Sequence, residues 1–214
     1  MKGFTVSEAA QRSPEWVLVR LGRLTGSRAR DMRARRPERE AVSRWKLRKQ
    51  LVQERLTGLL AVNGYENAAM RRGVDLEPAA IRAYEAQTGC VVRRTGFLAD
   101  DELMIGCSVD GDVDDFEGIV EVKCQAVWTH IDALIGGRVP ATHLPQITHN
   151  LWVSGASWCD FVSFDDRFGS PMRIAIRRVN RCDVDIVNYA GAARVFLAEV
   201  TRDYLAALGG KAAA

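Results

Sequence analysis

The spacing of apolar residues predicts several helices in the first ninety residues of the chain. Ser13-Pro14-Glu15 has the order of an N-cap followed by proline at the first helical position, which predicts a helix that runs to about Gly22. Ser27 can cap a second, short helix. From about Pro37 to Leu60, apolar residues recur at helical spacing opposite a basic face, and Asn63-Gly64 would end this longer helix. Its apolar stripe comprises Val42, Trp45, Val52, Leu56 and Leu59.

The rest of the chain alternates between strand and helix patterns. A helical pattern extends from Glu66 towards Thr88-Gly89, and Pro78 must kink it or begin a new helix directly after Glu77. Short apolar runs then predict strands of one sheet, at 91–92, 97–98, 104–109 and 119–124. Further helices are expected at about 126–135, 142–154 and 184–208, and further strands at 157–164 and 172–179. This order predicts a single α/β domain over residues 1–214, with a central mixed β-sheet flanked by helices.

The composition favours a soluble, intracellular protein. With 214 residues, 47% of them hydrophobic, the chain can form one substantial core. It has no apolar run long enough to span a bilayer, and its start lacks the apolar segment of a secretory signal. The five cysteines are widely spaced and never form C-x-x-C, which argues against a disulfide framework or a zinc site and fits a reducing cytoplasm.

Positive charge is concentrated in one segment. The net charge is only +3, but residues 28–55 contain eleven Lys or Arg against four Asp or Glu. Such a segment could raise the affinity for a phosphate backbone in a salt-dependent way. The alternative interpretation is a solvated helix face.

A charged pair lies on a predicted interior strand, within the stretch CSVDGDVDDFEGIVEVKC. If 119–124 is a strand, its two-residue period places Glu121 and Lys123 on one face and Val120 and Val122 on the other. Charges on an interior strand cost desolvation free energy unless something else occupies the site. A metal ion bound to carboxylates is one physical solution.

These residue types suit phosphodiester hydrolysis. Asp110 ends the preceding strand and can meet Glu121 across the hairpin, and hard carboxylate oxygens are ligands that Mg²⁺ prefers. Lys123 could position a metal-bound water or offset developing charge. Glu77 could help to hold a second ion, so that the attacking and leaving oxygens each meet a metal.

Three other interpretations remain open at this point. The acidic residues from Asp110 to Glu121 match positions 1, 3, 5 and 12 of an EF-hand loop, but Asp115 stands where glycine is needed and the flanks indicate strands. The aspartates at 112–115 can form nothing more than a polar hairpin loop. Finally, Glu121 and Lys123 can form a solvent-facing ion pair on an edge strand.

Four motifs occur in one order between about residues 13 and 166. Asp110, followed by Glu121-Val122-Lys123, is similar to the catalytic motif of the PD-(D/E)xK nuclease superfamily. The other three motifs are WVLVRLGRLTGSRARDM near the N-terminus, MRRGVDLEPAAIRAYEAQTG around Glu77, and PQITHNLWVSGASWCDFVSFD around Gln146. Together they resemble the phage lambda exonuclease, or YqaJ-type viral recombinase, family of that superfamily.

The resemblance implies a restriction-endonuclease-like core and a set of catalytic residues. Asp110, Glu121 and the main-chain carbonyl of Val122 would bind Mg²⁺, and Glu77 would assist the second ion. The two other roles fall to Lys123, which would serve the attacking water, and Gln146, which would orient in the active site.

The resemblance also implies a pocket for a 5′-terminal phosphate. Arg20 and Ser27 match the family positions that bind this group, and the chemistry fits, because Arg offers a charge-assisted fork and Ser27 would place its hydroxyl and nearby N–H groups at a helix start. The alternatives are an Arg in a surface ion pair and a plain Ser N-cap.

The implied activity is processive, Mg²⁺-dependent 5′-to-3′ digestion of one strand of linear duplex DNA, with Mn²⁺ as an alternative ion. The implied assembly is a homotrimeric ring that works with a single-strand annealing protein in phage or prophage recombination, in the bacterial cytoplasm and without a membrane. Departures from the family pattern are Val109 and Gln125 in place of prolines, and Thr148 and Asn150 in place of glutamines. None of them removes a predicted ligand.

Two rival functions fit the same motifs. One is an endonuclease of the same superfamily, which cuts at a sequence or a junction, and the other is a DNA-binding module that keeps the fold without catalysis. No metal-binding spacing surrounds His130, His143 or His149, so these histidines are predicted to be structural.

Overall fold

The computed structural model describes residues 4–11, 13–61 and 68–209, in which the strands form two four-stranded mixed sheets flanked by helices. The predicted α/β class is confirmed, but the strands divide between two sheets instead of forming one. The division lies at Val109 and Asp110, where the chain leaves β4 (Ile105–Ser108) of the first sheet and enters β5 (Gly111–Val113) of the second.

The first sheet has the strand order β1–β3–β4–β2, with β1 (Thr5–Ser7), β2 (Leu24–Thr25) and β3 (Phe97–Asp100). Its only parallel pair is β2 with β4. α1 (Pro14–Val19) begins as predicted, because the Ser13 hydroxyl accepts a hydrogen bond from the N–H of Trp16 (3.2 Å). Ser27, by contrast, lies inside a 3₁₀ turn, η1 (Gly26–Arg28), ahead of α2 (Ala29–Arg33), and caps neither.

The second sheet has the order β5–β6–β7–β8, with β6 (Gly118–Lys123), β7 (Trp158–Phe164) and β8 (Ile174–Asn180). β6 pairs with β5 in the antiparallel sense and with β7 in the parallel sense. β6 is therefore an interior strand, and its residue Glu121 lies opposite Phe161 of β7.

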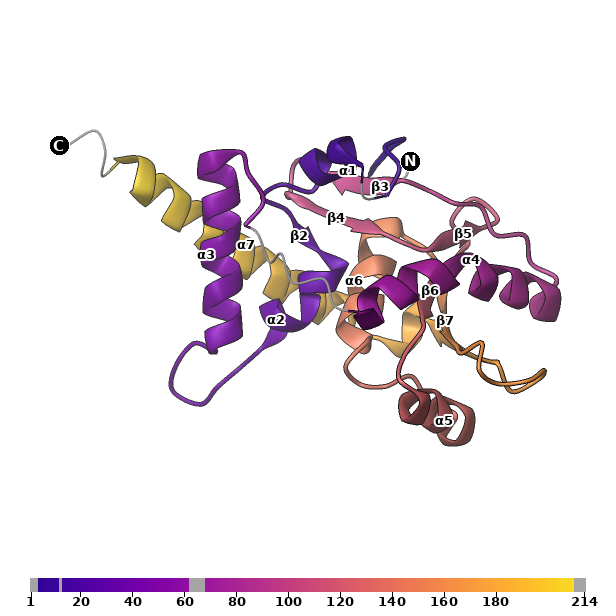
Figure 1. Cartoon of the computed structure of the whole chain (residues 1–214). Coiled ribbons are helices and arrows are strands. Elements are labelled where there is room, and N and C mark those ends of the chain that lie inside the picture. Colours follow the sequence, from indigo (N-terminus) through magenta and orange to yellow (C-terminus); the bar gives the residue numbers. More distant parts are fainter. Residues whose placement is uncertain (1–3, 12, 62–67, 210–214) are drawn as a thin grey trace.

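Helices cover both faces of the second sheet and connect it to the first (Figure 1). α4 (Ala68–Thr88) packs on one face, whereas α5 (Val127–Gly136) and α6 (Leu144–Ser154) pack on the other. α6 also contacts η1 and the strands β3 and β4 of the first sheet, so it lies between the two sheets. α3 (Val42–Thr57) lies across the long α7 (Ile186–Gly209), and η2 (Arg181–Asp183) precedes α7.

The buried apolar side chains form two clusters, one on each side of β6. The larger cluster includes Leu98, Ile119 and Phe196, and the smaller one includes Tyr84 and Val120. Because consecutive residues of β6 contribute to different clusters, a polar side chain in the middle of this strand is held in the interior of the protein.

Three predicted elements need correction. α4 continues through Pro78, because the turns beyond it are anchored by buried residues such as Tyr84, although proline removes one backbone donor. The run at 91–92 forms no strand, and only Arg93 makes an isolated bridge to Asp112. α3 begins at Val42 instead of Pro37, and the predicted end at 63–64 lies outside the described residues.

Candidate active site

β6 carries the charged residues of the predicted motif into the interior. Glu121 is only 2% exposed, and Lys123 lies partly exposed at the end of the strand. Ile119, on the same face, belongs to the larger core cluster, whereas Val120 and Val122 belong to the smaller one, so the predicted division of faces is confirmed. Because β6 is an interior strand, the alternative of a solvent-facing ion pair on an edge strand is wrong.

Asp110 lies at the entry to β5, directly beside β6. Its N–H donates to the carbonyl of Val120 (3.1 Å), and its Oδ2 accepts from the N–H of Val122 (2.7 Å). Burial and the negative charge of Glu121 raise the pKa of Asp110 to about 8, with a smaller contribution from Glu77. The carboxylates from β5 and β6 are thus close enough for their charges to interact strongly.

Three side chains donate hydrogen bonds to the carboxylate of Glu121. Lys123 Nζ and Gln146 Nε2 (2.6 Å) contact Oε1, and Asn150 Nδ2 contacts Oε2 (2.9 Å). The two amides are one helical turn apart, so α6 presents both of them to β6. The sequence pointed to Gln146 but gave Asn150 no role, since no local periodicity connects it to Glu121.

Lys123 remains a cation in this environment. Burial alone would lower the pKa of Lys123, but the negative charges of Glu121 and Asp110 raise it above its ordinary value. The amine can therefore donate hydrogen bonds and offset negative charge, but it is a poor proton acceptor.

Glu77 and Asp110 line the same cleft, which has a volume of about 320 Å³. The other walls come from residues 8–11 and 94–96. Gln11 Nε2 donates to the carbonyl of Val109 (3.1 Å), so the first wall is tied to the residue directly before Asp110. Contrary to the sequence prediction, Glu77 lies within a continuous helix and not at a break.

Arg20 is linked through Trp16 to the end of β4. The Arg20 guanidinium lies 3.9 Å over the Trp16 ring, and Trp16 Nε1 donates to Ser108 Oγ (2.9 Å), two residues before Asp110. Burial, and next the positive charge of Arg28, lower the pKa of Arg20 to about 10. The sequence alone gave no indication of the contact between Trp16 and Ser108.

Ser27 approaches the site from the turn after β2. Its Oγ lies 3.3 Å from Thr25 Oγ1. At the adjacent Gly26, an added Cβ would lie only 2.2 Å from Asn150 Oδ1 and 3.4 Å from Gln146 Cγ. The turn that bears Ser27 therefore packs directly against the face of α6 that contacts Glu121.

A buried carboxylate from α3 holds this turn in place. Glu54 is 1% exposed, and its side chain accepts hydrogen bonds from Arg28 and from the N–H of Gly22 (2.9 Å). Arg28 thus has its own counterion, which leaves Arg20 as a separate cation above Trp16.

Asp112 is a structural residue of β5. It is 1% exposed, and both of its carboxylate oxygens accept hydrogen bonds from Arg93 (3.0 Å each). The turn that follows has left-handed backbone at Asp114 and Asp115 and closes a β-hairpin. This arrangement rules out the EF-hand alternative. The alternative that residues 112–115 form only a loop is also wrong, because residues 112 and 113 belong to β5.

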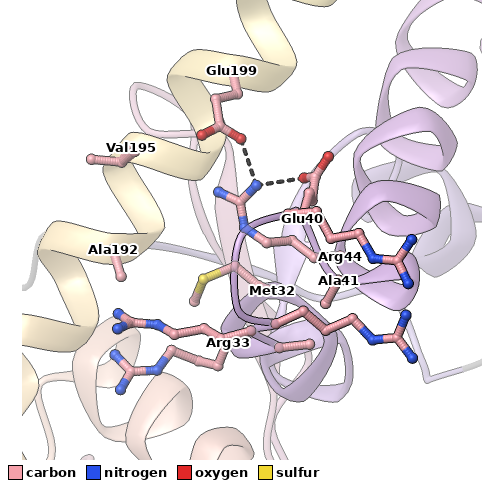
Figure 2. A pocket seen from close by; sticks show the side chains of 12 residues that line it. Met32, Arg33, Glu40, Ala41, Arg44, Ala192, Val195 and Glu199 are labelled. Carbon is pink, nitrogen blue, oxygen red and sulfur yellow. Dashed lines mark hydrogen bonds and ion pairs between the residues drawn. The ribbon is translucent and has the colours of Figure 1, made fainter.

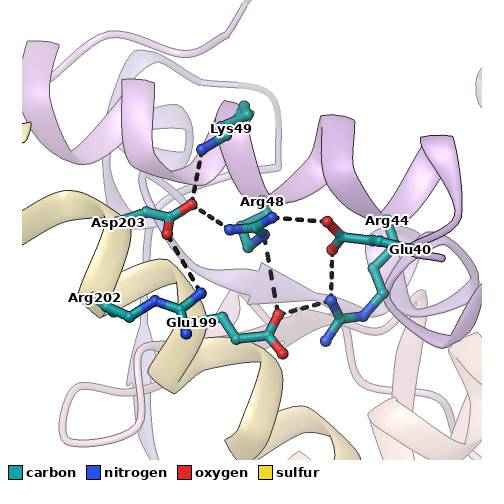
Figure 3. A network of polar contacts seen from close by, with 7 residues as sticks. All are labelled: Glu40, Arg44, Arg48, Lys49, Glu199, Arg202 and Asp203. Atoms are coloured by element: carbon teal, nitrogen blue, oxygen red, sulfur yellow. Dashed lines mark hydrogen bonds and ion pairs between the residues drawn. The ribbon is translucent and has the colours of Figure 1, made fainter. Parts of the chain in front are cut away.

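Part of the basic segment is neutralised by internal ion pairs. Figure 3 shows that Arg44, Arg48 and Lys49 of α3 pair with three carboxylates, which are Glu40, Glu199 and Asp203. The arginines at 35, 36 and 39 are exposed in the loop before α3 and line a pocket of about 420 Å³. Figure 2 shows Arg33, Arg44 and Glu199 around this pocket. This loop thus presents three exposed arginines, whereas three basic residues of α3 are held in ion pairs.

The donor set fits a hard divalent cation. Two carboxylates interact at the junction of β5 and β6, and the raised pKa of Asp110 means that the protein alone does not stabilise both negative charges. No group of three His, Cys, Asp or Glu side chains among the described residues is arranged to hold an ion. An ion at Asp110 and Glu121 would therefore need further oxygen ligands, from the substrate, from water or from the main chain.

The three histidines make structural contacts. His130 hydrogen-bonds Ser163 (2.9 Å) and His149 hydrogen-bonds Tyr189 (2.9 Å), both in the interior. His143 contacts Gln125 (2.7 Å), and burial lowers its pKa to about 4. All three are consistent with the structural role that was predicted for them.

The motifs and the fold match one known family. The model of the YqaJ-like viral recombinase domain matches residues 15–157, about two thirds of the chain. The chain belongs to this family. The match includes Arg20, Ser27 and the whole β5–β6 junction, and no curated protein matches the chain significantly.

Solved structures agree with this membership. The alkaline exonuclease LHK-Exo from Laribacter hongkongensis is 35% identical, with a TM-score of 0.83 over 94% of this chain and 98% of that one. Its complex with dAMP gives the same values. A phage-related exonuclease from Haemophilus somnus 129PT, 14% identical with a TM-score of 0.68 over 88% and 96% of the chains, shares the fold. The family and LHK-Exo support a nuclease. No described helix is long and apolar enough to cross a membrane.

Proposed function

We propose that the protein is a Mg²⁺-dependent 5′-to-3′ exonuclease that digests one strand of linear double-stranded DNA. The observation that carries the proposal is the buried carboxylate of Glu121, which is contacted by Lys123 and Gln146 and interacts with Asp110. Two acidic groups, a permanent cation and an amide at one point suit the hydrolysis of a charged ester better than they suit simple DNA binding.

Asp110 and Glu121 would hold the first ion, together with the carbonyl of Val122, and Glu77 would contribute to a second. When bound, Mg²⁺ neutralises the scissile phosphate and lowers the pKa of a coordinated water. Lys123, as a protonated amine, would orient the attacking water and offset charge that develops on the phosphate. Gln146 would keep Glu121 in position.

Arg20 and Ser27 would select the DNA end. Among the described residues, no carboxylate pairs with Arg20 as Glu54 pairs with Arg28, and Arg20 contacts Trp16, which bonds Ser108 two residues before Asp110. A terminal phosphate held there would place the next phosphodiester at the acidic residues. The reaction would release deoxynucleoside 5′-monophosphates, the class of the dAMP in the LHK-Exo complex.

The proposal includes the assembly expected for the family. A homotrimeric ring would encircle the duplex, and a single-strand annealing protein would receive the exposed strand. The exposed arginines at 35, 36 and 39 would contact the phosphate backbone. Light scattering should give a mass three times that of the chain, and a monomer would refute the ring. The cytoplasm of a bacterial host remains the expected location.

A time course on end-labelled DNA tests the activity. Linear duplex with distinguishable labels at each 5′ and 3′ end should release the 5′ labels first, only with Mg²⁺, while closed circular duplex stays intact. Early loss of the 3′ labels would contradict the polarity. Cleavage of the circle would favour an endonuclease, and binding without release of nucleotides would favour a DNA-binding module.

The phosphate pocket has its own test. Arg20→Ala should lower kcat/KM on 5′-phosphorylated ends much more than on 5′-hydroxyl ends, because only the former lose a charge-assisted hydrogen bond. Equal losses on both ends would reject this pocket. Arg138→Ala, at an exposed position after α5, is a matched control and should change neither value.

A further inference from the structure

Asn150 contacts the catalytic carboxylate and the Ser27 turn at the same time. It is 1% exposed, and its Nδ2 donates to Glu121 Oε2 (2.9 Å). Its Oδ1 lies against Gly26, where an added Cβ would come within 2.2 Å of that oxygen. One side chain on α6 thus bridges the two halves of the proposed site, which are far apart in sequence.

The amide oxygen of Asn150 has no hydrogen-bond partner among the described residues. Within the described part of the chain, Asn150 Oδ1 is one of the few buried side-chain atoms without a partner. A buried acceptor without a donor costs roughly 1–3 kcal/mol. Rotating the amide by half a turn would not help, because its oxygen would then face the carboxylate of Glu121. The orientation of Asn150 is therefore set by Glu121, at a cost to stability.

Gln146 has a parallel arrangement. It also donates to Glu121 (2.6 Å), and its Cγ would lie 3.4 Å from a Cβ at position 26. Both amides of this face of α6 therefore reach the carboxylate and pack on the same glycine. Only glycine at position 26 lets the turn approach α6 this closely.

We propose that Asn150 is a positioning residue that fixes the Glu121 carboxylate relative to the Ser27 turn, and that Gly26 is required for this contact. This inference rests on the proposed function and adds to it a structural link between the end-binding turn and the metal-binding carboxylate. Through Asn150, the spacing between the end-binding turn and the metal-binding carboxylate is held constant. Neighbours that orient a metal ligand typically contribute 10- to 100-fold to metal affinity or activity.

The first test separates positioning from stability. In Asn150→Ala, Mg²⁺ affinity measured by calorimetry and kcat should each fall about 10- to 100-fold. The preference for 5′-phosphorylated over 5′-hydroxyl ends should also shrink. The thermal midpoint in EDTA should stay close to wild type, because removal of the unsatisfied oxygen offsets loss of the hydrogen bond to Glu121. Ser154→Ala, which alters another buried polar residue of α6, should leave all these values unchanged. Wild-type Mg²⁺ affinity and kcat in Asn150→Ala would overturn the proposal, and so would a variant that unfolds.

The second test uses the close contact itself. Gly26→Ala should displace Asn150 and reduce kcat, whereas the double variant Gly26→Ala/Asn150→Ala should be no worse than Asn150→Ala, because the shortened side chain leaves room for the new methyl group. If the reduction in kcat of the double variant equalled the product of the reductions in the two single variants, the proposed contact between Gly26 and Asn150 would be refuted. If the wild-type protein released no nucleotides, the proposed function would fail, whereas the Mg²⁺ titrations would still decide the role of Asn150.

Discussion

Replacing Asp110 with asparagine should stabilise the protein at alkaline pH in the absence of divalent ions, and should abolish nuclease activity. Asparagine has the same shape as aspartate, and its Oδ1 can still accept the hydrogen bond from the N–H of Val122. The substitution therefore removes the charge and keeps the local geometry. Its effect on stability reports how strongly the folded protein opposes ionisation at this position.

The expected magnitude follows from the raised pKa of Asp110. The pKa is raised from 3.8 to about 8, and each tenfold change in proton affinity corresponds to about 1.4 kcal/mol, so the full effect is on the order of 5 kcal/mol. Because the folded state binds this proton more tightly than the unfolded chain does, stability should fall as pH rises from about 4 to about 8 and should then level off. The stabilising effect of Asp110→Asn should be largest above pH 8.

Urea unfolding in EDTA at pH values from 6 to 9 measures this difference. The free energy of unfolding of the wild type should fall relative to that of Asp110→Asn across the interval, and added Mg²⁺ should restore the wild type but not the variant. Asp132→Asn, at an exposed position of α5, should run parallel to the wild type. Parallel curves for wild type and Asp110→Asn would refute the view that Asp110 carries a destabilised charge.

Three further substitutions probe separate parts of the structure. Lys123→Ala should lower kcat by about 10²- to 10³-fold while DNA binding measured by anisotropy with Ca²⁺ is kept, and unchanged turnover would remove Lys123 from the mechanism. Glu54→Gln should cost about 3–5 kcal/mol in urea unfolding, since it leaves Arg28 without its buried partner, and a loss below 1 kcal/mol would contradict that role. Asp160→Asn weakens the contacts to Tyr84 and Arg178 on the opposite face of the sheet, so it should lower the free energy of unfolding by about 2 kcal/mol. The kcat of the folded enzyme should stay unchanged, and a loss of kcat would show that the two faces are coupled.

The motif on β6 could be predicted because its periodicity is local. Alternation of apolar and charged residues at 119–124 is enough to indicate a strand and to assign Glu121 and Lys123 to one face. An interior strand then forces both charges into the protein. Asp110 could be placed beside this strand for a similar reason, because a short hairpin leaves little freedom in how its two strands pair.

The orientation of α3 could not be predicted in this way. Four of the five residues of the predicted stripe, including Trp45 at 47% and Leu59 at 68%, are largely exposed, whereas Leu47 and Leu51 are buried. The helix carries apolar residues on two faces. One of them is turned inward where α3 packs against α7, and the ion pairs across this contact involve carboxylates 155 residues away in sequence.

Contacts between distant elements were likewise beyond the sequence. Asn150 reaches Glu121 over 29 positions, and Trp16 reaches Ser108 over 92 positions. Neither pair has a spacing that marks it locally. Pro78 is the opposite case. Proline usually kinks or ends a helix, but here packing holds the helix on both sides of it and α4 continues.

The proposed cation site at Asp110 and Glu121 can be tested by diffraction from crystals soaked in Mn²⁺, recorded where manganese scatters anomalously. We expect an anomalous peak within coordination distance of both carboxylates, which disappears in crystals of Asp110→Asn. A peak elsewhere on the protein, or none at saturating Mn²⁺, would show that these two side chains do not share an ion.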